Sequence, residues 1–319
     1  MTELITAGEP MGLFIAQTPG PLAQVNQFEC RLAGADLNVA IGVARLQHTV
    51  QFITQIGQDV FGQKILNLLK REQIATTNVY QTTEWSTGMM LKGMATNGQP
   101  EVDYYRKASA AAHLSPQQVT QVDFERVKIL HLGGILAGLS EAGYQTTLQL
   151  IKLARQHQVL ITFDPNLRPT IWESTEQMIQ RTNEIARLCD VIMPNIKEAQ
   201  TLTGTAEVSQ IAEFYLQTSS VQQVIINLID DGAYSCQRHR DGTVATTQLP
   251  TFKVEHLVDK VGAGDGFVAG VLTAMLENLS VSQSLQRGLA LEAIQMQHRG
   301  DNEGLPTPTS LEKFLQQAQ

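Results

Sequence analysis

The feature that most constrains the fold is a regular alternation of short apolar runs with longer amphipathic ones. The short runs have the length of buried strands, and the longer runs repeat apolar residues at helical spacing. Strands that alternate with helices predict βαβ units, in which helices cover both faces of a mostly parallel sheet. The expected strands are Leu4–Ala7, Gln51–Gln55, Ile129–Leu132, Leu160–Phe163, Val191–Met193 and Val224–Leu228. The expected helices include Asp36–Leu46, Phe61–Glu72, Ala142–His157, Ser174–Leu188 and Val208–Gln217.

Two stretches interrupt this alternation. Gly12–Arg31 and Gly88–Arg106 are rich in strand-forming and turn residues but contain no helical pattern. We interpret them as a small antiparallel sheet that projects from the main domain as a lid. The chain shows no Gly/Ser-rich linker, low-complexity run or internal repeat. We therefore expect one domain over residues 1–319, with lid segments at about 12–31 and 88–106.

Composition narrows the class of protein. The chain has 319 residues, of which 43% are hydrophobic, and a net charge of −8, which argues against nonspecific binding of nucleic acid. No apolar run approaches the roughly 20 residues that span a bilayer, and the start MTELITAGEPMG lacks the features of a signal peptide. Cys30, Cys189 and Cys236 are widely spaced without a CxxC pair, which is typical of reduced, buried thiols. We expect a cytoplasmic protein with no membrane or nucleic-acid partner.

Asp265 directly follows the small residues Gly262-Ala263-Gly264 at the start of an apolar helical run. The first turn of a helix offers backbone N–H groups without partners, and the helix dipole favours an anion there. Glycines let a phosphate approach that backbone closely. A carboxylate beside the phosphate could take a proton from an attacking hydroxyl. The segment therefore predicts phosphoryl transfer to an alcohol, although glycines before a helix are also common in plain turns.

Small residues also lead into the helix expected from residue 36. Asp36 could cap this helix. Alternatively, Gly34, Asp36 and Asn38 face a polyhydroxylated ligand. An asparagine suits such a ligand because its amide can both donate to and accept from a hydroxyl.

Two basic segments predict contacts to an anion. Tyr104 and Arg106 would share one face of a strand, where a ring and a guanidinium suit an anionic sugar. The alternative is a solvated edge strand. Arg168 lies in the loop FDPNLRP, directly after an expected strand, and the two prolines stiffen that loop. We interpret Arg168 as an anion contact, with a simple pairing to Asp164 as the alternative.

Asn195 and Glu198 begin another helix in the string PNIKE. They could form a capping box, in which each side chain accepts from the other residue's backbone N–H. Alternatively, both organise Mg²⁺ through water beside nucleotide phosphates.

Taken in order, these motifs resemble the ribokinase-like (pfkB-type) carbohydrate kinases over nearly the whole chain. The landmarks are GAxxN from Gly34, NxxE from Asn195 and VGAGD from Val261. Within the family, the strings TAGEPM, DYYRKASAAAHLSP, FDPNLRPTIW and RGDNEGLPT look most like 2-keto-3-deoxygluconate kinases. The resemblance implies a three-layer α/β/α fold with a mostly parallel central sheet and a small β lid. It also implies ATP as donor, Mg²⁺ as cofactor, and a homodimer or higher homo-oligomer formed through the lid.

The resemblance also implies roles for single residues. Asp265 would deprotonate the terminal hydroxyl of the sugar acid, and the backbone of Gly262, Ala263 and Gly264 would stabilise charge on the transferring phosphoryl group. The implied substrate-binding residues are Gly34, Asp36, Asn38, Met90, Tyr104, Arg106 and Arg168, with Arg168 on the carboxylate. The implied ATP-binding residues are Asn195, Asn227, Gly232, Lys260, Gly264 and Leu289, and Asn195 and Glu198 would bind magnesium through water.

The departures from the family pattern concentrate on the nucleotide side. Relatives carry a Lys/Thr-x-Gly-x-x-Gly turn where this chain has NLIDDG, so that Ile229 replaces a glycine. Lys260 stands where a threonine is usual; it supplies positive charge near the phosphates, replaces a monovalent cation, or is solvated. Leu289 and Glu292 replace an asparagine and a small residue near the adenine, and Met90 replaces a tyrosine near the sugar.

Three functions stay open at this point. The first is a sugar-acid kinase with an altered nucleotide pocket, and the second is a kinase for fructose or another ketose. The third is a kinase-like protein that binds sugar acids without efficient use of ATP. The intact Asp265 and its glycine turn favour catalysis, because a binding protein gains little from a general base.

Overall fold

The main sheet has nine strands among the residues described by the computed structural model, which are 2–94, 100–254 and 256–317. Part of the predicted lid segment 88–106, residues 95–99, lies outside the described residues. The strands are β1 (Leu4–Ala7), β4 (Val50–Gly57), β5 (Val79–Thr82), β8 (Ile129–Gly133), β9 (Leu160–Asp164), β10 (Val191–Ile192), β11 (Gln223–Asn227), β12 (Ala233–Arg238) and β13 (Val244–Leu249). Their order is β13-β12-β11-β10-β9-β8-β1-β4-β5. Pairing is parallel except at one edge, where β12 is antiparallel to β11 and β13. The predicted parallel sheet is confirmed.

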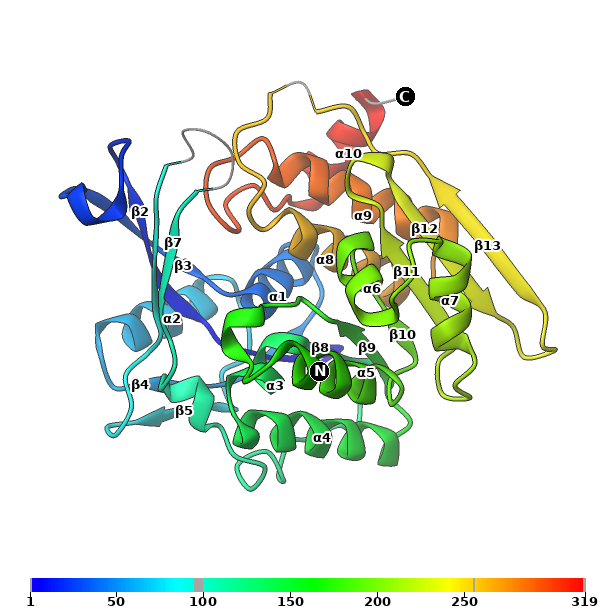
Figure 1. The fold of residues 1–319 in the computed structure, drawn as a ribbon, viewed down its shortest axis with the longest axis horizontal. Helices are drawn as coiled ribbons and strands as arrows, with labels where there is room; N and C mark the ends of the chain where they lie inside the picture. Colours follow the sequence, from blue (N-terminus) through cyan, green and yellow to red (C-terminus); the bar gives the residue numbers. More distant parts are fainter. Residues whose placement is uncertain (1, 95–99, 255, 318–319) are drawn as a thin grey trace.

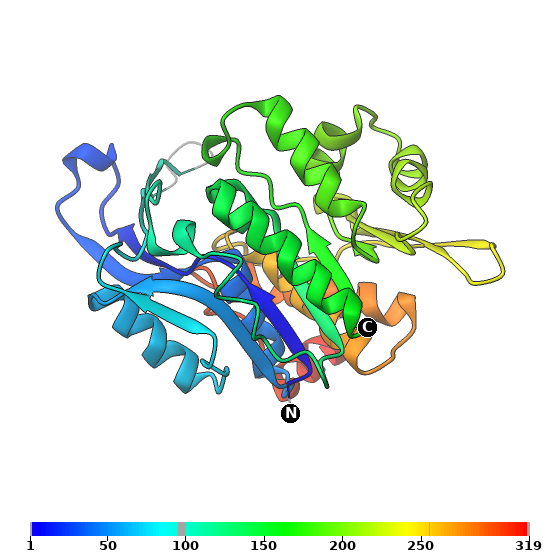
Figure 2. The same cartoon turned by 90° about the horizontal axis from the view of Figure 1, so that it is seen from below.

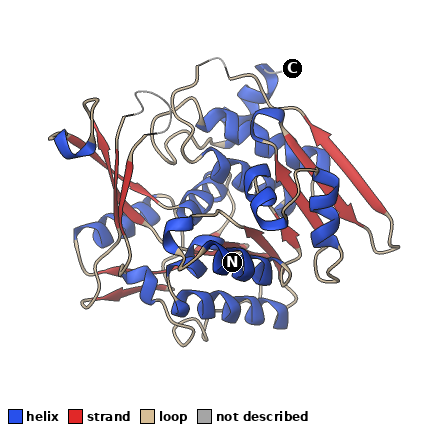
Figure 3. Ribbon diagram, in the orientation of Figure 1, coloured by secondary structure: helices blue, strands red, loops and turns tan. Residues whose placement is uncertain are grey.

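Helices cover both faces of this sheet, giving three layers (Figure 3). One face packs against α1 (Ala35–Arg45), α2 (Val60–Arg71), α8 (Ala263–Leu276), α9 (Val281–Gln295) and α10 (Pro308–Gln317). The other packs against α3 (Gly134–Leu139), α4 (Glu141–Gln156), α5 (Thr175–Ala186), α6 (Ile196–Thr203) and α7 (Val208–Leu216). Alternate side chains of a strand enter opposite cores, as Leu4 and Ile5 do in β1. None of the described helices combines the length and the apolarity that crossing a membrane requires.

The observed helix boundaries depend on which residues cap the helices. The predicted helix Ser174–Leu188 is Thr175–Ala186, because the Ser174 hydroxyl is the cap and accepts from the Gln177 N–H at 3.1 Å. The expected cap of α1 is wrong. Gly34 is the N-cap residue and no side chain caps this helix, so Asp36 already lies inside the first turn.

The lid is a second sheet of β2 (Met11–Ala16), β3 (Phe28–Ala33), β6 (Met89–Lys92) and β7 (Val102–Tyr105), in the order β3-β2-β6-β7. It stands at one side of the main body in both Figure 1 and Figure 2. The prediction of a purely antiparallel sheet is wrong, because β2 and β6 pair in parallel. Each is the first strand of its own antiparallel pair, β2 with β3 and β6 with β7, and these first strands lie side by side.

The cysteines only partly follow the prediction. Cys189 and Cys236 are buried, as expected, whereas Cys30 is exposed on β3. Cys30 lies on β3, an edge strand of the lid sheet.

Candidate active site

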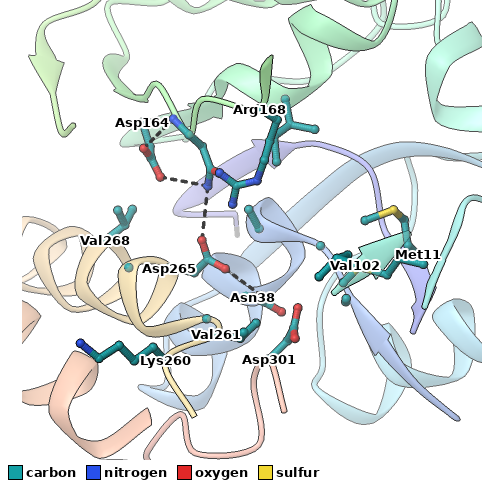
Figure 4. Close-up of a pocket in the computed structure, with 18 of the residues that line it drawn as sticks. Met11, Asn38, Val102, Asp164, Arg168, Lys260, Val261, Asp265, Val268 and Asp301 are labelled. Carbon is teal, nitrogen blue, oxygen red and sulfur yellow. Dashed lines mark hydrogen bonds between the residues drawn. The ribbon is translucent and has the colours of Figure 1, made fainter. Parts of the chain in front are cut away.

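A cavity of about 510 Å³ lies between the carboxyl edge of the main sheet and the lid (Figure 4). Asp164 ends β9, Asn227 ends β11, and Asn195 follows β10, so parallel strands deliver these side chains to one edge. The lid supplies Met90 and Tyr104 from the opposite side. The predicted site residues that line this cavity are Gly34, Asn38, Met90, Tyr104, Arg106, Arg168, Asn195, Glu198, Asn227, Lys260, Gly262, Gly264 and Asp265.

The glycine turn begins α8 as the sequence predicts. Gly262 is the N-cap residue in a left-handed conformation, with a φ of 72°. A Cβ at this position would lie 1.8 Å from the Asp301 carbonyl oxygen, so only glycine fits. A Cβ at Gly264 would meet nothing within 4 Å, and within the described chain its N–H has no acceptor. The Ala263 N–H makes only a long contact of 3.4 Å to the Lys260 carbonyl. The turn thus has space and free donors for an anion.

Asp265 is buried in the first turn of α8 and held by two amides (Figure 4). Its Oδ2 accepts from Asn38 Nδ2 at 2.8 Å, and its Oδ1 accepts from Asn166 Nδ2 at 3.5 Å. Burial raises the pKa of Asp265, although the Asn38 hydrogen bond, the charge of Arg168 and the Asn166 hydrogen bond act in the opposite direction. A carboxyl with a raised pKa, fixed in orientation, suits a general base.

Asn38 lines the cavity, but its amide is already engaged on both sides. Its Nδ2 donates to Asp265, and its Oδ1 accepts from Asn302 Nδ2 at 2.9 Å. In this arrangement Asn38 orients the candidate base. Its predicted contact to a sugar hydroxyl stays a prediction.

Asp36 does not line the cavity, and its predicted contact to a ligand stays a prediction. Its carboxyl is buried, and Gly8 and Gly133 pack against it so closely that a Cβ on either would lie within 2.6 Å of one of its oxygens. Burial, and then the charge of Asp265, raise the pKa of Asp36 to about 7. Two positions after Gly34, the helix has turned this side chain towards the sheet.

Three of the cationic side chains in the cavity wall have carboxylate partners. Arg106 forms a buried ion pair with Glu9, and its guanidinium carbon lies 5.3 Å from the centre of the Tyr104 ring. The predicted grouping of Tyr104 with Arg106 is confirmed, although Arg106 follows the end of β7. Lys92 pairs with Asp259 at 2.7 Å, and the exposed Lys260 pairs with Asp230 at 3.5 Å.

Arg168 differs from these cations. Its Nη1 donates to its neighbour's carbonyl, Leu167 O, at 2.9 Å. Among the described residues no carboxylate lies within the 4.0 Å of an ion pair, so the alternative of an Asp164–Arg168 pair is wrong. The guanidinium lies in the cavity near Asp265 (Figure 4). It is therefore available to an anionic ligand.

Asn195 and Glu198 form the predicted capping box at the start of α6. Glu198 also binds the Arg168 loop, because its Oε1 accepts from the Leu167 N–H at 2.9 Å while its Oε2 accepts from the Asn195 N–H at 3.0 Å. Both oxygens are thus engaged, and a contact to magnesium would pass through water. The described residues contain no cluster of three or more His, Cys, Asp or Glu side chains able to hold a metal ion. This donor set fits a magnesium ion that arrives with a nucleotide and is held mainly by phosphates and water.

A second cavity, of about 470 Å³, adjoins the first. Asn195, Asn227, Lys260 and Gly264 line both cavities, and Ala263 lines the second. The other residues lining the second cavity are Ile229, Asp230, Thr251, Phe252, Lys253, Val254, Leu257, Glu292 and Met296. It extends from the glycine turn along an apolar wall, as a site for the phosphates and base of a nucleotide would.

Two residues with predicted nucleotide contacts, Gly232 and Leu289, fall outside the lining of both cavities, and these contacts stay predictions. Gly232 packs against the Leu249 carbonyl oxygen, 2.0 Å from where a Cβ would lie. Leu289 is 1% exposed in the core around α8 and α9. Both residues shape the backbone or core beside the cavity without reaching it.

Several residues of the site were not among the predicted ones. Glu9, Asn166, Asp301 and Asn302 all lie in the strings TAGEPM, FDPNLR and RGDN, so the signal was present in those motifs. Lys92 carried no such signal, and neither did the apolar wall of the second cavity, because its loop residues form no pattern.

Comparisons with known proteins agree with this geometry. The model of the pfkB family carbohydrate kinases matches residues 1–308. The chain is 37% identical over 314 residues to a 2-dehydro-3-deoxygluconokinase of Bacillus subtilis (strain 168), covering 98% of this chain and 95% of that protein. It is 27% identical to a 2-dehydro-3-deoxygluconokinase of Thermoproteus tenax (99% and 94%) and 26% identical to fructokinase-1 of Oryza sativa subsp. japonica (99% and 99%).

Solved structures show the same fold. A PfkB protein from Polaromonas sp. JS666 superposes with a TM-score of 0.88 at 33% identity, covering 98% of this chain and 99% of that one. An uncharacterized sugar kinase of Pyrococcus horikoshii in complex with ATP gives 0.81 at 25% identity, covering 97% of each chain. The fold, the glycine turn with its buried aspartate and these matches lead to one assignment. The chain belongs to the pfkB family of carbohydrate kinases.

Proposed function

We propose that the protein is a sugar-acid kinase that transfers the γ-phosphate of ATP to the terminal hydroxyl of 2-keto-3-deoxygluconate. The observation that carries the proposal is the presence of Asp265 and an Arg168 without a carboxylate partner in one cavity. A substrate with a hydroxyl at one end and a carboxylate at the other matches these two groups. The 37% identity to a 2-dehydro-3-deoxygluconokinase supports the same substrate.

In the proposed reaction, the terminal hydroxyl oxygen of the sugar acid attacks the γ-phosphorus of ATP. Asp265 takes the hydroxyl proton, the bond from phosphorus to the β–γ bridging oxygen breaks, and ADP leaves with that electron pair. The products are the 6-phosphate of the sugar acid and ADP. The backbone N–H groups at the start of α8 stabilise the negative charge of the transferring phosphoryl group. Water exclusion by the lid would protect this step from hydrolysis.

Magnesium enters the proposal as part of the MgATP substrate and neutralises phosphate charge. Asn195 and Glu198 would hold it through water from the border of the two cavities. A monovalent cation stays a prediction. Met90, Tyr104 and Arg106 would form the lid side of the sugar-acid site, and Gly34 its floor.

The test is a panel of acceptors with the purified protein and MgATP, in which phosphorylated products are measured by mass spectrometry. We expect turnover of 2-keto-3-deoxygluconate well above that of fructose and ribose. Preferred turnover of fructose would support the second candidate function, a ketose kinase. The 26% identity to fructokinase-1 is the observation that favours this candidate. No turnover of any sugar, with a retained thermal shift on addition of the sugar acid, would leave only a binding protein.

Asp265→Asn tests the base. The amide cannot accept the proton, so kcat should fall about 100- to 10 000-fold, while the dissociation constant for the sugar acid changes little. Asp241→Asn, which removes an exposed carboxylate between β12 and β13, is the matched control. An Asp265→Asn variant with a near-normal kcat would exclude Asp265 as the base.

A further inference from the structure

Two residues that depart from the family pattern touch each other in the second cavity. Asn227 Nδ2 donates to both carboxylate oxygens of Glu292, at 3.0 and 3.1 Å. The Asn227 Oδ1 accepts from the Ile229 N–H at 2.7 Å, which fixes the orientation of the amide. Ile229 is itself a departure, in the same turn. These replacements therefore form one hydrogen-bonded unit and not a set of independent losses.

The Glu292 carboxylate lacks donors. It is 7% exposed on α9, and among the described residues Asn227 alone donates to it. A carboxylate offers about four acceptor positions, and burying one with so few partners costs free energy. Lys260, a neighbouring cation, is 60% exposed and paired with Asp230. Burial raises the pKa of Glu292 to about 7, as expected for a carboxyl that the chain itself does not satisfy.

A ligand in the second cavity, which Glu292 lines, can supply the missing donors. Glu292 lines the second cavity together with the start of α8, so a ligand with its phosphates at the glycine turn can reach the carboxylate with its other end. Phe252, Val254 and Leu257 add apolar side chains to the lining of this cavity, beside the polar Thr251 and Lys253. Glu292 is thus a buried acceptor in a cavity whose apolar side chains can also pack against a flat ring.

We propose that Glu292 determines which nucleotide this kinase prefers, by accepting hydrogen bonds from two adjacent donors of the nucleotide. This inference rests on the proposed function, because it places a nucleotide in the second cavity. Two parts of a nucleotide carry such a pair of donors: the 2′- and 3′-hydroxyls of ribose, and the N1–H and N2–H edge of guanine. Asn227 is then a positioning residue that holds the carboxylate towards the cavity.

The experiment compares nucleotides in the wild-type protein and in Glu292→Gln, which keeps the shape of the side chain but turns one acceptor into a donor. kcat/KM is measured for ATP, 2′-deoxyATP, GTP and 2′-deoxyGTP at saturating sugar acid. If ribose is the partner, the wild type should use ATP at least about 10-fold better than 2′-deoxyATP, since a buried group left unpaired costs about that much. If guanine is the partner, GTP should exceed ATP by a similar factor and 2′-deoxyGTP should match GTP.

In either case, Glu292→Gln should bring the ratio of kcat/KM between the preferred and the disfavoured nucleotide close to one. The KM for the sugar acid should stay unchanged. Glu312→Gln, an exposed carboxylate on α10 outside both cavities, should keep the wild-type ratios. A wild type that uses all four nucleotides within about 3-fold, or a Glu292→Gln variant with the wild-type ratios, overturns the inference. The wild-type ratios decide alone if the variant does not fold.

Calorimetric titration of the same nucleotides separates this inference from the proposed function. If no nucleotide supports turnover, the kinase proposal fails. The inference still holds if the titrations show the same preference and Glu292→Gln abolishes it, and it fails if they show none.

Discussion

Arg168 is a cation without a carboxylate partner among the described residues. The neighbouring cations Arg106, Lys92 and Lys260 pair with carboxylates, whereas Arg168 reaches only a backbone carbonyl. Arg168→Ala should therefore lower kcat/KM for the sugar acid about 10- to 100-fold, the worth of a hydrogen bond to a charged group. A neutral ketose should lose much less.

The ratio of the two substrates separates a carboxylate contact from a general effect on Asp265, whose pKa Arg168 also lowers. Arg240→Ala, on the exposed turn between β12 and β13, removes the same charge outside both cavities and should leave the ratio unchanged. Equal losses with acidic and neutral sugars would remove Arg168 from the carboxylate site.

Asp36 gives a pH-dependent prediction because its pKa is raised to about 7 in the folded protein, against about 3.9 in an unfolded chain. Folding then takes up a proton. The contribution of this carboxyl to the free energy of unfolding is greatest below pH 4 and is lost as the pH rises through 7. Asn cannot ionise, so Asp36→Asn should gain stability relative to the wild type between pH 5 and pH 8, by at most about 4 kcal/mol.

Urea unfolding of both proteins at several pH values measures this difference. The Asn Oδ1 can still accept from the Gly133 backbone, so the packing should survive. Asp123→Asn, at an exposed position, is the control for the loss of a carboxylate outside the core. If the difference in unfolding free energy between Asp36→Asn and the wild type stays constant from pH 5 to pH 8, Asp36 is ionised in the folded protein.

At the scale of elements, the turn after β11 places a β-branched residue in a strained backbone conformation. Ile229 has a φ of 63°, a left-handed conformation that costs a β-branched residue roughly 1–2 kcal/mol. Glycine adopts it freely but loses more entropy on folding. Ile229→Gly should therefore stabilise the protein by up to about 1 kcal/mol, seen as a higher urea midpoint.

Ile229→Ala is the matched control. It removes the branched side chain but keeps a Cβ at a positive φ, so it should not stabilise. Equal gains in both variants would point to the bulk of Ile229 rather than to its backbone. Because Ile229 donates its N–H to Asn227, the midpoint should be measured with and without nucleotide.

Elements with a strong local signal were predictable. The capping box of α6 and the helices after Ser140 and Ser174 start where a polar side chain precedes an amphipathic run. β12 and β13 were not predicted, because β12 mixes apolar and polar residues without alternation and β13 is a mostly exposed edge strand. α3 was missed because its six residues are too short to show a period.

At the scale of the whole molecule, strand–helix alternation was enough to predict the parallel sheet, and the motifs predicted most of the cavity. The parallel pairing of β2 and β6 could not be predicted, because it joins segments about 75 residues apart with no pattern in common. The contacts that Asp36, Arg106 and Asn227 make with other elements could not be predicted either. Each depends on how close two elements approach, which spacing along one chain does not encode.

The lid sheet exposes an aromatic side chain on the face that points away from the cavity. Tyr104 turns to the cavity, and the next residue, Tyr105, points the other way and is 55% exposed. The sheet also ends in the edge strands β3 and β7, and uncovered edges invite pairing. We propose that a second copy of the chain packs on this face through the lid.

Light scattering coupled to gel filtration tests this proposal. The wild type should have the mass of a dimer or a higher oligomer, and Tyr105→Asp should shift it towards the monomer because a charge would be buried in the contact. Tyr105→Phe should behave as the wild type. Since Tyr105 lies outside both cavities, weaker activity in Tyr105→Asp would follow from the lid's position rather than from a lost ligand contact. That activity should recover at high protein concentration if association closes the lid. A wild type that stays monomeric at the highest soluble concentration would exclude this contact and leave the lid face to another role.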